Sequence, residues 1–501
     1  MKSVSSTKVS VARSFSRDTR GIILPYMTFM LVVIVGVSVL ALDGARLMGL
    51  QTQLQAGADA LALAGAAELD RLPDSITRAT NAINSLVTNP TLSGVKSTEI
   101  VQVADIQFLR SLPPDDSDPI SPDNVTTDPT RARFVQVTIE PVMLSTILPA
   151  SIFGGSSNVT VGAQAVAGFD QVLCNSIPLF VCNPFETEHM TYFEATQALV
   201  DANNDKSINR KLVRLVSMQT KKAANAAGDF GYVRPATGAL PANTCGPRDG
   251  EGVAQAMAVS RVRACIKLSG INVQPSDDQA AMDGLNTRFD VYANSFKSCI
   301  NYAPDENVRR GYVIQGNTNW CAATASAASW PLPNPSATPL PVDENMVVIN
   351  GAGNQVLDTN VAVGDGVWDC ETYWNVAHFS GPGREAPPPG CSKAATISRY
   401  DVYRYEMNYL GDRSRANEIG APRCSPPGVS GRRVVYVPIV NCNSSPVAVQ
   451  SNSQNVPVAA FGRFFLVLPS NRYTNGSPYA EFLGLVSPTD KLSRDVVQLY
   501  R

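Results

Sequence analysis

The sequence has 501 residues, and its 41 basic and 43 acidic side chains give a formal net charge of −2. Such a balance offers no basic patch of the kind that binds nucleic acid, so no DNA or RNA partner is expected. Thirty-five prolines and thirty-five glycines, with only 17% charged residues, indicate a folded, loop-rich chain with room for an anchor and two or three domains.

The chain begins with a basic, serine-rich tail without an apolar period, which predicts a flexible segment over residues 1–20. The stretch that follows, Ile22 to Leu42, contains no charged residue. A helix of this length rises about 1.5 Å per residue and crosses the hydrocarbon core of a bilayer, which is about 30 Å thick. Because the tail carries Lys2, Lys8, Arg13, Arg17 and Arg20, we expect it in the cytoplasm.

A cleaved secretory signal is the alternative explanation for an apolar segment near the start of a chain. The apolar core of such a signal has about 7–15 residues, and cleavage would here fall near Ala41. Since the uncharged stretch is longer and no small-x-small site interrupts it before Asp43, we expect a retained membrane anchor.

After this stretch the pattern becomes that of an amphipathic helix, and one continuous helix is expected over residues 21–69. Its apolar face consists of Leu47, Leu50, Leu54, Ala58, Leu61 and Gly65. Small residues recur at four-residue steps, first Ala41, Ala45 and Gly49 and then Ala56, Ala60 and Ala64. Such rows let a second helix approach closely, although alanine also occurs simply as a good helix former.

These residues resemble the N-terminal region of Tad (Flp) pilus-assembly proteins of the TadE/TadG-like class. The similar stretches are the pair Arg20 and Gly21, the apolar span, Ala41 to Arg46 and Leu50 to Ala67. The residues that fall on family positions are Gly21, Asp43, Arg46, Gln55, Asp59 and Gly65. The resemblance implies a pilus-assembly component whose Ala/Gly-rich helix packs against other Tad/Flp proteins.

The chain departs from the family pattern at one position. Pilin-like members that are cut by the prepilin peptidase carry Glu at the fifth position after the cleaved glycine, whereas Tyr26 stands there when counted from Gly21. This departure favours a resident membrane protein over a subunit that is processed and extruded into the fibre. The Asp-x-Ser-x-Ser metal motif of a von Willebrand A domain, which some TadG-like proteins carry, is not found in the sequence.

A pilin-like α+β module is expected over residues 70–172, with a small antiparallel sheet as the resemblance implies. A helix between Arg71 and Ser97 would carry an apolar face of Ile76, Ala79, Ile83 and Leu86. Strands are expected at Ile100–Phe108, Phe134–Ile139 and Val159–Ala167, with an exposed loop at Pro113–Pro119. The segment Gly168–Phe185 is expected to be a hinge to the next module.

Residues 173–501 are expected to form a larger, loop-rich α+β domain. Its central strands are predicted at Val434–Val440, Phe461–Leu468 and Tyr479–Val486. Stretches such as Gly366 to Trp374 also resemble long Tad-like proteins of alphaproteobacteria, but they indicate no role.

All ten cysteines follow the apolar span, which indicates an oxidising compartment and up to five disulfides. Many connectivities are open to them, and pairing sequence neighbours would join Cys174 to Cys182, Cys245 to Cys265, Cys299 to Cys321, Cys370 to Cys391 and Cys424 to Cys442. Zinc is the alternative, but no pair has C-x-x-C spacing.

No catalytic constellation stands out in the sequence. His189 and His378 lack a Gly-x-Ser-x-Gly elbow, and a partly buried, hydrogen-bonded role is expected for each. The segment Gly351–Gly353 is expected to be a tight turn. Asp369 and Glu371 lie in one short segment, which says nothing of the carboxylate spacing that a glycosidase needs.

The sequence thus predicts an α+β protein with one N-terminal transmembrane helix, a long juxtamembrane extension and a disulfide-containing periplasmic domain. It would lie in the bacterial inner membrane and act without catalysis, by binding and scaffolding in Tad/Flp pilus assembly or a related secretion apparatus. The expected partners are the lipid bilayer and other pilus proteins, with no cofactor, no metal, no nucleic acid and no small-molecule substrate identified. The alternatives are a membrane-anchored periplasmic enzyme acting on cell-wall glycan and a surface-displayed adhesin.

Overall fold

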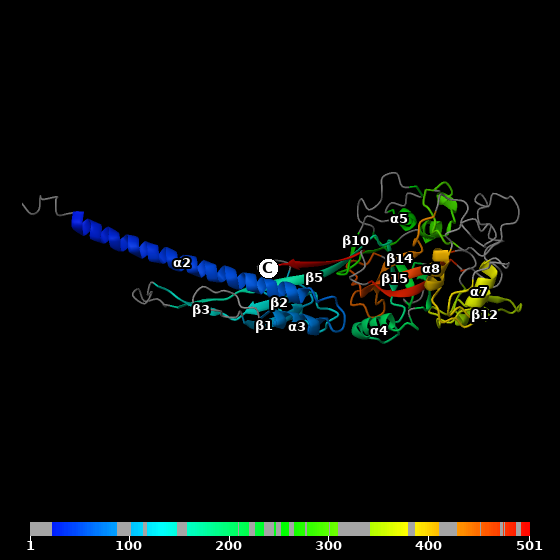
Figure 1. Cartoon of the computed structure of the whole chain (residues 1–501), viewed down its shortest axis with the longest axis horizontal. Helices are drawn as coiled ribbons and strands as arrows, with labels where there is room; N and C mark the ends of the chain where they lie inside the picture. The colour runs from blue at the N-terminus through cyan, green and yellow to red at the C-terminus, as the bar shows by residue number, and fades with distance from the viewer. Residues whose placement is uncertain are drawn as a thin grey trace, which may run out of the picture.

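The computed structural model describes the chain from residue 23 to residue 500 with gaps. The described ranges are 23–87, 102–113, 118–147, 158–208, 210–219, 226–234, 245–246, 252–259, 265–275, 278–299, 301–308, 341–378, 386–409, 428–450, 452–470, 474, 476–486 and 492–500. They form an elongated molecule in which a long helix leads into a narrow sheet and then into a broader end (Figure 1). We call the helix with its sheet the stalk and the broad end the head.

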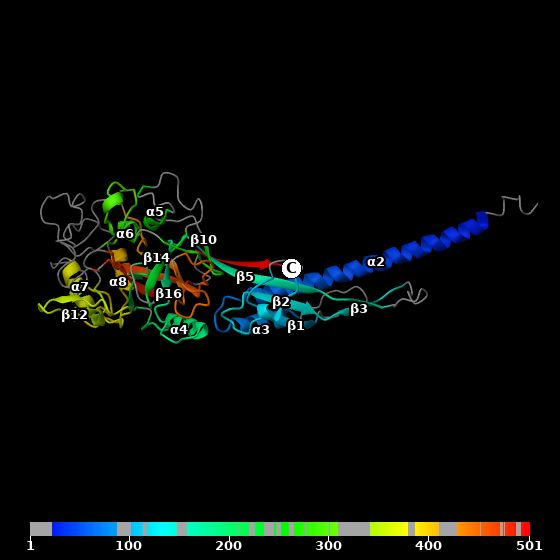
Figure 2. The same cartoon turned by 180° about the vertical axis from the view of Figure 1, so that it is seen from behind.

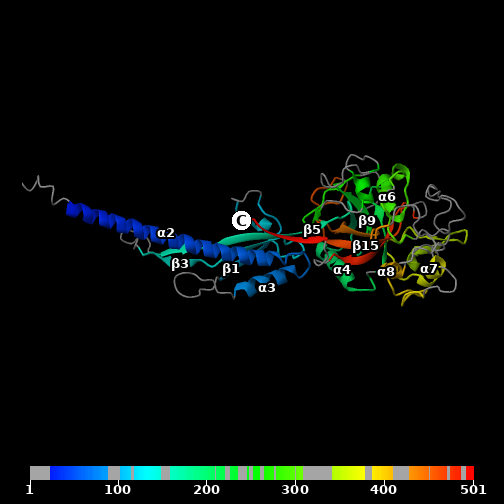
Figure 3. The same ribbon diagram turned by 45° about the horizontal axis from the view of Figure 1, so that its top comes forward.

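The stalk is built on helix α2, which runs unbroken over Ile23–Ala66 and confirms the predicted continuous helix. Its 44 residues correspond to about 66 Å at the usual rise per residue. From Leu50 onward the predicted apolar face is buried, including Leu54, Ala58 and Leu61. Helix α3, Ser75–Val87, packs beside it and buries Ala79 and Ile83 of the predicted face (Figure 3). Ile76 is half-buried, whereas Leu86 is 39% exposed, so its predicted place on the buried face is wrong.

The sheet of the stalk is antiparallel and covers the buried face of α2. Its strand order is β1 (Val103–Leu109), β2 (Phe134–Ile139), β5 (Gln164–Cys174) and β10 (Cys265–Lys267), and β17 (Ser493–Leu499) also pairs with β5. In β2 the alternating Val135, Val137 and Ile139 are buried as predicted. The predicted strand Val159–Ala167 is two strands, because the strand is interrupted at Gly162 and Ala163. β4 (Asn158–Val161) pairs with β3 (Val142–Ser145), whereas β5 pairs with β2.

The predicted hinge at Gly168–Phe185 is wrong, because β5 continues through Gly168 to Cys174. The strand is held by β2, β10 and β17, and it runs from the stalk to the head (Figures 1 and 2). A side chain at Gly168 would place its Cβ 2.5 Å from Cδ1 of Phe134 and 2.8 Å from Cε2 of Tyr500. The glycine therefore provides room for two packed rings and does not bend the chain.

The head is built on an eight-stranded mixed sheet. Its order is β11 (Val273–Gln274), β9 (Asp229–Val233), β6 (Leu179–Cys182), β14 (Val434–Val440), β15 (Ala460–Leu468), β16 (Tyr479–Leu485) and β7 (Leu212–Arg214), with β8 (Val216–Ser217) beside β9. The three predicted central strands are β14, β15 and β16, within one residue of their observed ends.

Helices cover both faces of the head sheet. They are α4 (Tyr192–Asn204), α5 (Val253–Ala258), α6 (Asp278–Asn286), α7 (Cys370–Ala377) and α8 (Arg399–Tyr409). The head also contains the hairpin of β12 (Val347–Ile349) and β13 (Gln355–Leu357) and the 3-10 turns Thr287–Phe289, Asn294–Phe296 and Glu344–Met346. One further 3-10 turn, Pro122–Asn124, lies between β1 and β2 of the stalk. Alternate residues of β15 divide between two buried clusters: Phe464 and Leu466 lie with α5 and α6, whereas Phe465 and Val467 lie with α7 and α8.

Stalk and head share one hydrophobic core. The cluster that contains Leu54 and Ala62 of α2 continues through Leu173 of β5 to Val456 and Phe461 of the head. A continuous core resists bending because separating the two parts would expose apolar surface to water.

The disulfides correct most of the neighbour pairing. Cys174 bonds to Cys265, Cys182 to Cys442 and Cys245 to Cys299, so four of the five neighbour pairs are wrong, whereas Cys370 bonds to Cys391 as predicted. Cys174 and Cys265 face each other in the paired strands β5 and β10, and this register decides their partnership. Cys321 and Cys424 lie outside the described residues.

Candidate functional site

The N-terminal part of α2 is an exposed apolar rod. Phe29 is 76% exposed, Leu31 63% and Leu40 66%, and no charged residue occurs in the helix before Asp43. By length and composition, Pro25–Ala66 contains a stretch that can cross a membrane. Apolar surface on this scale is unfavourable in water, so the segment fits a single-pass membrane anchor. Gly21 and the basic tail lie outside the described residues.

Asp43 connects the end of this rod to the β3–β4 hairpin. Its side chain is buried, and Oδ1 accepts a hydrogen bond of 2.9 Å from the backbone N–H of Ile147. The same oxygen lies 3.7 Å from Nη1 of Arg46, one turn further along the helix. Asp43 and Arg46, two of the six family positions, thus hold the segment after β3 close to α2.

Gln55 and Asp59 form a second connection between α2 and the sheet. Nε2 of Gln55 donates to Oδ1 of Asp59 at 2.8 Å and to the backbone oxygen of Gln164, the first residue of β5, at 3.0 Å. Asp59 accepts a hydrogen bond from one N–H of the Gln55 amide and so orients the other N–H toward the strand. This pair therefore holds the helix to the start of β5.

Gly65 allows α3 and β2 to approach α2 closely. A Cβ at this position would lie 2.6 Å from Cδ1 of Ile83 and 3.4 Å from Cγ1 of Val135. The first distance is shorter than van der Waals contact, so a side chain would have to displace Ile83. In the structure, this family position serves packing within the chain.

Of the six small residues predicted to recur at four-residue steps, Ala64 is half-buried, whereas the other five lie on the opposite face and are exposed. They are Ala41, Ala45, Gly49, Ala56 and Ala60. A Cβ at Gly49 would meet no atom within 4 Å. At about 3.6 residues per turn, these five positions point about half a turn away from the buried positions Leu50, Leu54, Ala58 and Leu61. The exposed small-residue face, defined by these five residues, is therefore open.

In the head, His378 belongs to a closed hydrogen-bonded cluster. Its Nε2 lies 2.9 Å from Oε1 of Glu406, which also accepts from the hydroxyl of Tyr373, and its ring stacks on Trp374 with centroids 3.8 Å apart. Nδ2 of Asn307 donates to Oε2 of Glu406 at 2.5 Å. The predicted buried role of His378 is confirmed. Since Glu406 is fully buried, the cluster is suited to stabilising the head and not to meeting a substrate.

The remaining candidates for chemistry have structural roles. His189 is exposed with φ 73°, so its predicted partial burial is wrong; the residue forms part of an exposed turn before α4. Asp369 caps α7 by accepting from the N–H of Thr372 at 2.8 Å. The predicted tight turn at Gly351–Gly353 is confirmed as the turn of the β12–β13 hairpin. Within the described ranges, no group of three or more His, Cys, Asp or Glu side chains is placed to hold a metal ion.

A second buried network joins Arg399, Asp343 and Glu481. Nη2 of Arg399 lies 2.6 Å from Oδ1 of Asp343, and its Nη1 lies 3.4 Å from Oε1 of Glu481. The backbone N–H groups of Arg399 and Tyr400 each donate to Glu481 at 2.9 Å. Burial raises the pKa of Glu481 to about 7, and Arg399 opposes this rise. All three side chains of the ion-pair network are inaccessible to solvent.

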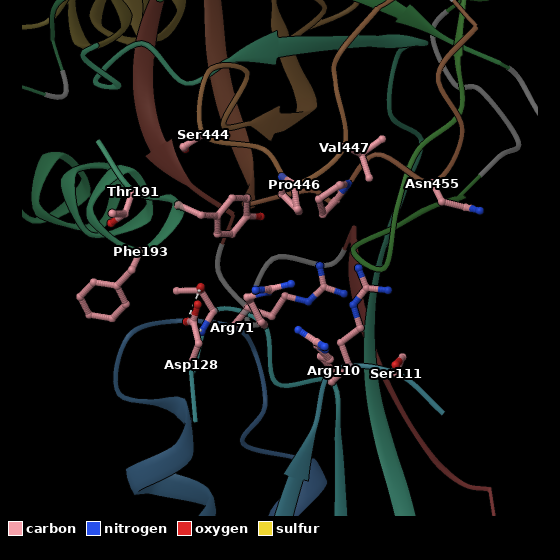
Figure 4. Close-up of a pocket in the computed structure, with 15 residues that line it drawn as sticks. Arg71, Arg110, Ser111, Asp128, Thr191, Phe193, Ser444, Pro446, Val447 and Asn455 are labelled. Atoms are coloured by element: carbon pink, nitrogen blue, oxygen red, sulfur yellow. Dashed lines mark hydrogen bonds between the residues drawn. The ribbon is translucent and has the colours of Figure 1, made fainter. Parts of the chain in front are cut away.

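One cavity of the structure was not indicated by the sequence. It has a volume of about 450 Å³ and lies where stalk and head meet. Its lining includes Arg71, Arg110, Arg131 and Arg133 from the stalk and Ser444, Pro446, Val447, Asn455 and Pro457 from the head (Figure 4). The four arginines stand in three separate loops and strands, and only the alternation at residues 131–133 is a local signal. We call this cavity the arginine pocket.

Comparison with protein families matches residues 21–68 of this chain to the family described as putative Flp pilus-assembly TadE/G-like. Comparisons with curated proteins and with solved structures found no match. The matched residues are those of the apolar rod and of the helix that Asp43, Gln55 and Gly65 join to the stalk. This N-terminal segment is therefore similar to the TadE/G-like Flp pilus-assembly family, and the match does not extend to the rest of the chain.

Proposed function

We propose that this chain is a membrane-anchored, non-enzymatic component of Tad/Flp pilus assembly or of a related secretion apparatus. The observation that carries the proposal is the coincidence of the family match with α2, whose first half is an exposed apolar rod and whose second half is built into the stalk. Such a helix gives the head a fixed position and orientation at a membrane surface. The protein would act by binding and scaffolding.

The chain would lie in the inner membrane with its N-terminus in the cytoplasm and the stalk and head in the periplasm. The basic tail before the apolar rod supports this orientation. The disulfides of the head support it independently, because disulfides persist in oxidising compartments such as the periplasm. The stalk and the head would be separate functional units that divide near residue 173, with β17 returning to the stalk.

The partner surface would be the exposed small-residue face of α2. Intramolecular contacts use the other side of the helix, so the Ala and Gly row stays free for a helix of another pilus protein. Small side chains bring helix backbones close enough for extensive van der Waals contact. The proposal predicts that bulk on this face blocks assembly without unfolding the stalk.

The first test is a deletion of the gene followed by counting of surface pili. Loss of pili, restored by the wild-type gene, is expected. Normal pili and normal surface adhesion in the deletion strain would overturn the proposal.

The second test complements the deletion with Ala45→Leu combined with Ala56→Leu, and separately with Gln51→Leu as a control. All three positions are exposed on α2, but Gln51 lies outside the small-residue face. We expect pili to be lost with the double variant and kept with the control, while both proteins accumulate in the membrane. Equal piliation in the two strains would contradict a partner role for this face.

A further inference from the structure

The arginine pocket lies between two different kinds of wall. On the stalk side, Arg71 and Arg110 point into the space, and on the head side Pro446 and Val447 close it (Figure 4). Phe193 of helix α4 lies at the outer edge of the pocket, with its ring directed away from Arg71 and Pro446 (Figure 4). A cationic floor facing an apolar wall is a typical arrangement for binding an organic anion.

The pocket carries more positive than negative charge. Four arginines line it, and among its lining residues Asp128 is the acidic one. Oδ1 of Asp128 is already engaged by the N–H and hydroxyl of Thr130, at 2.9 and 2.6 Å. The lining therefore leaves an excess of cationic charge.

Arg71 is the buried member of the set and is only 3% exposed. Its Nη1 donates to the backbone oxygens of Leu268 at 2.6 Å and of Val458 at 3.3 Å, which orients the guanidinium. Its backbone has φ 66°, a conformation that a non-glycine residue adopts at a local cost. Burial, together with the nearby charge of Arg133, lowers the pKa of Arg71 to about 9. These two carbonyl groups engage Nη1 but do not neutralise the charge of the guanidinium.

Arg133 is half-buried at the start of β2. Among the residues that the structure describes, no hydrogen bond or ion pair holds its guanidinium, although the carboxylate of Asp170 attracts it electrostatically. Arg131 lies two residues earlier, in the turn before β2, and is exposed. Their forked donors are thus available to a ligand, and forks of this kind match the oxygens of phosphate groups.

We propose that the arginine pocket binds a soluble phosphate monoester, with the phosphate on Arg71, Arg131 and Arg133 and the organic part against Pro446 and Val447. A group with two negative charges matches several guanidinium groups better than a single carboxylate does. The pocket volume accommodates a small molecule. Binding at this place would link stalk and head through one ligand.

A lipid headgroup of the anchoring bilayer does not reach the pocket. Between Leu42, where the apolar stretch ends, and Ala66, where α2 ends, the helix is about 36 Å long. Arg71 follows beyond that end. The phosphate is therefore expected to come from solution.

The binding test uses the full chain in nanodiscs of phosphatidylcholine and three probes: phenyl phosphate, inorganic phosphate and benzoate. Calorimetric titration should show saturable binding that is tightest for phenyl phosphate, weaker for inorganic phosphate and weakest for benzoate. No saturable binding, or benzoate binding as tightly as phenyl phosphate, would overturn the proposal.

The variants are Arg133→Gln and Arg131→Gln, with Arg404→Gln as the matched control. Arg404 is exposed on α8 and does not line the pocket, so the control removes the same charge elsewhere. Each pocket variant should bind phenyl phosphate at least about tenfold more weakly, as expected for a lost charge-assisted contact, and the control should bind like the wild type. Since Arg131 is exposed, its variant should keep the melting temperature of the wild type. Unchanged affinity in both pocket variants would refute the site.

A competition experiment distinguishes the two sources of phosphate. Vesicles of phosphatidate in phosphatidylcholine, added to the loaded protein, should leave phenyl phosphate bound. Displacement that depends on Arg131 would overturn the assignment of a soluble ligand.

Discussion

The carboxylate of Asp43 accepts a hydrogen bond from the backbone N–H of Ile147 at 2.9 Å, across 104 positions of sequence. Asp43 is also the first charged residue after the apolar rod. The contact therefore places the end of strand β3 beside the point where α2 would leave the membrane. A family position that sequence comparison marks only as a motif acts here as a tether between helix and hairpin.

The tether predicts different effects for two substitutions at Asp43. Asp43→Ala leaves the Ile147 N–H without its acceptor and should lower the free energy of unfolding by about 1–3 kcal/mol. Asp43→Asn keeps an oxygen acceptor and should lose less. Hydrogen exchange checks this directly, because the Ile147 amide should exchange faster in Asp43→Ala than in Asp43→Asn. Equal protection of the Ile147 amide in both variants and the wild type would contradict a stabilising role for this hydrogen bond.

The close approach at Gly65 predicts that a methyl group destabilises the stalk. Gly65→Ala should cost about 1–3 kcal/mol, because its Cβ meets Ile83. The matched control is Gly49→Ala on the exposed face of the same helix, which should be neutral or stabilising by up to about 1 kcal/mol. Thermal unfolding of both variants gives the comparison.

A second substitution identifies the cause of that cost. Ile83→Val shortens the side chain that the new methyl group would meet, so the pair Gly65→Ala with Ile83→Val should recover part of the lost stability. The double variant should therefore lose less stability than the two single variants together. A loss equal to or greater than that sum would show that the clash with Ile83 is not the cause.

The disulfide pattern predicts which peptides remain linked in an unreduced digest. Peptides that contain Cys174 and Cys265, and those that contain Cys182 and Cys442, should appear as cross-linked pairs by mass spectrometry. Replacing both members of the second pair with Ser should cost about 2–5 kcal/mol. Dithiothreitol should lower the melting temperature for the same reason. A cross-link between Cys174 and Cys182 would contradict the observed pairing.

The pairing of the C-terminal strand with β5 predicts that truncation of the C-terminus affects the stalk. β17 pairs with β5 from Ser493 to Leu499, and the ring of Tyr500 contacts Phe134 at 5.0 Å. A chain that ends at residue 491 should therefore expose β5 and become sensitive to protease in the stalk. A chain that ends at residue 500 is the control and should behave like the wild type. Protease resistance of the shorter chain would show that β17 contributes little.

Glu481 predicts a loss of stability as pH rises. Its pKa is about 7 in the folded head and near 4.5 when the chain is unfolded, so the folded state holds the extra proton between these values. The contribution of the group is fully present below pH 4.5 and is lost as the pH rises to about 7. Melting temperature measured across this range should fall more steeply for the wild type than for Glu481→Gln. Parallel curves would show that Glu481 does not titrate in this range.

The sequence by itself determined the parts of this protein that depend on local pattern. An uncharged run followed by a 3.6-residue period defined α2 and its buried face, and apolar runs between turn residues defined β14, β15 and β16. The position of the cysteines after the apolar span indicated disulfides. In each case the signal lies within one element, because burial of one face imposes its period on that stretch alone.

Only the tertiary structure decided which distant segments meet. No local pattern shows that β17 returns to β5, that Cys182 bonds to Cys442, or that the predicted hinge is a continuous strand held by neighbours on both sides. The arginine pocket is of the same kind, since the arginines of the stalk face Pro446 and Val447 of the head only when stalk and head share a core. Such pairings depend on the total free energy of apolar burial and strand hydrogen bonding over the whole chain. A single stretch of sequence does not contain this information.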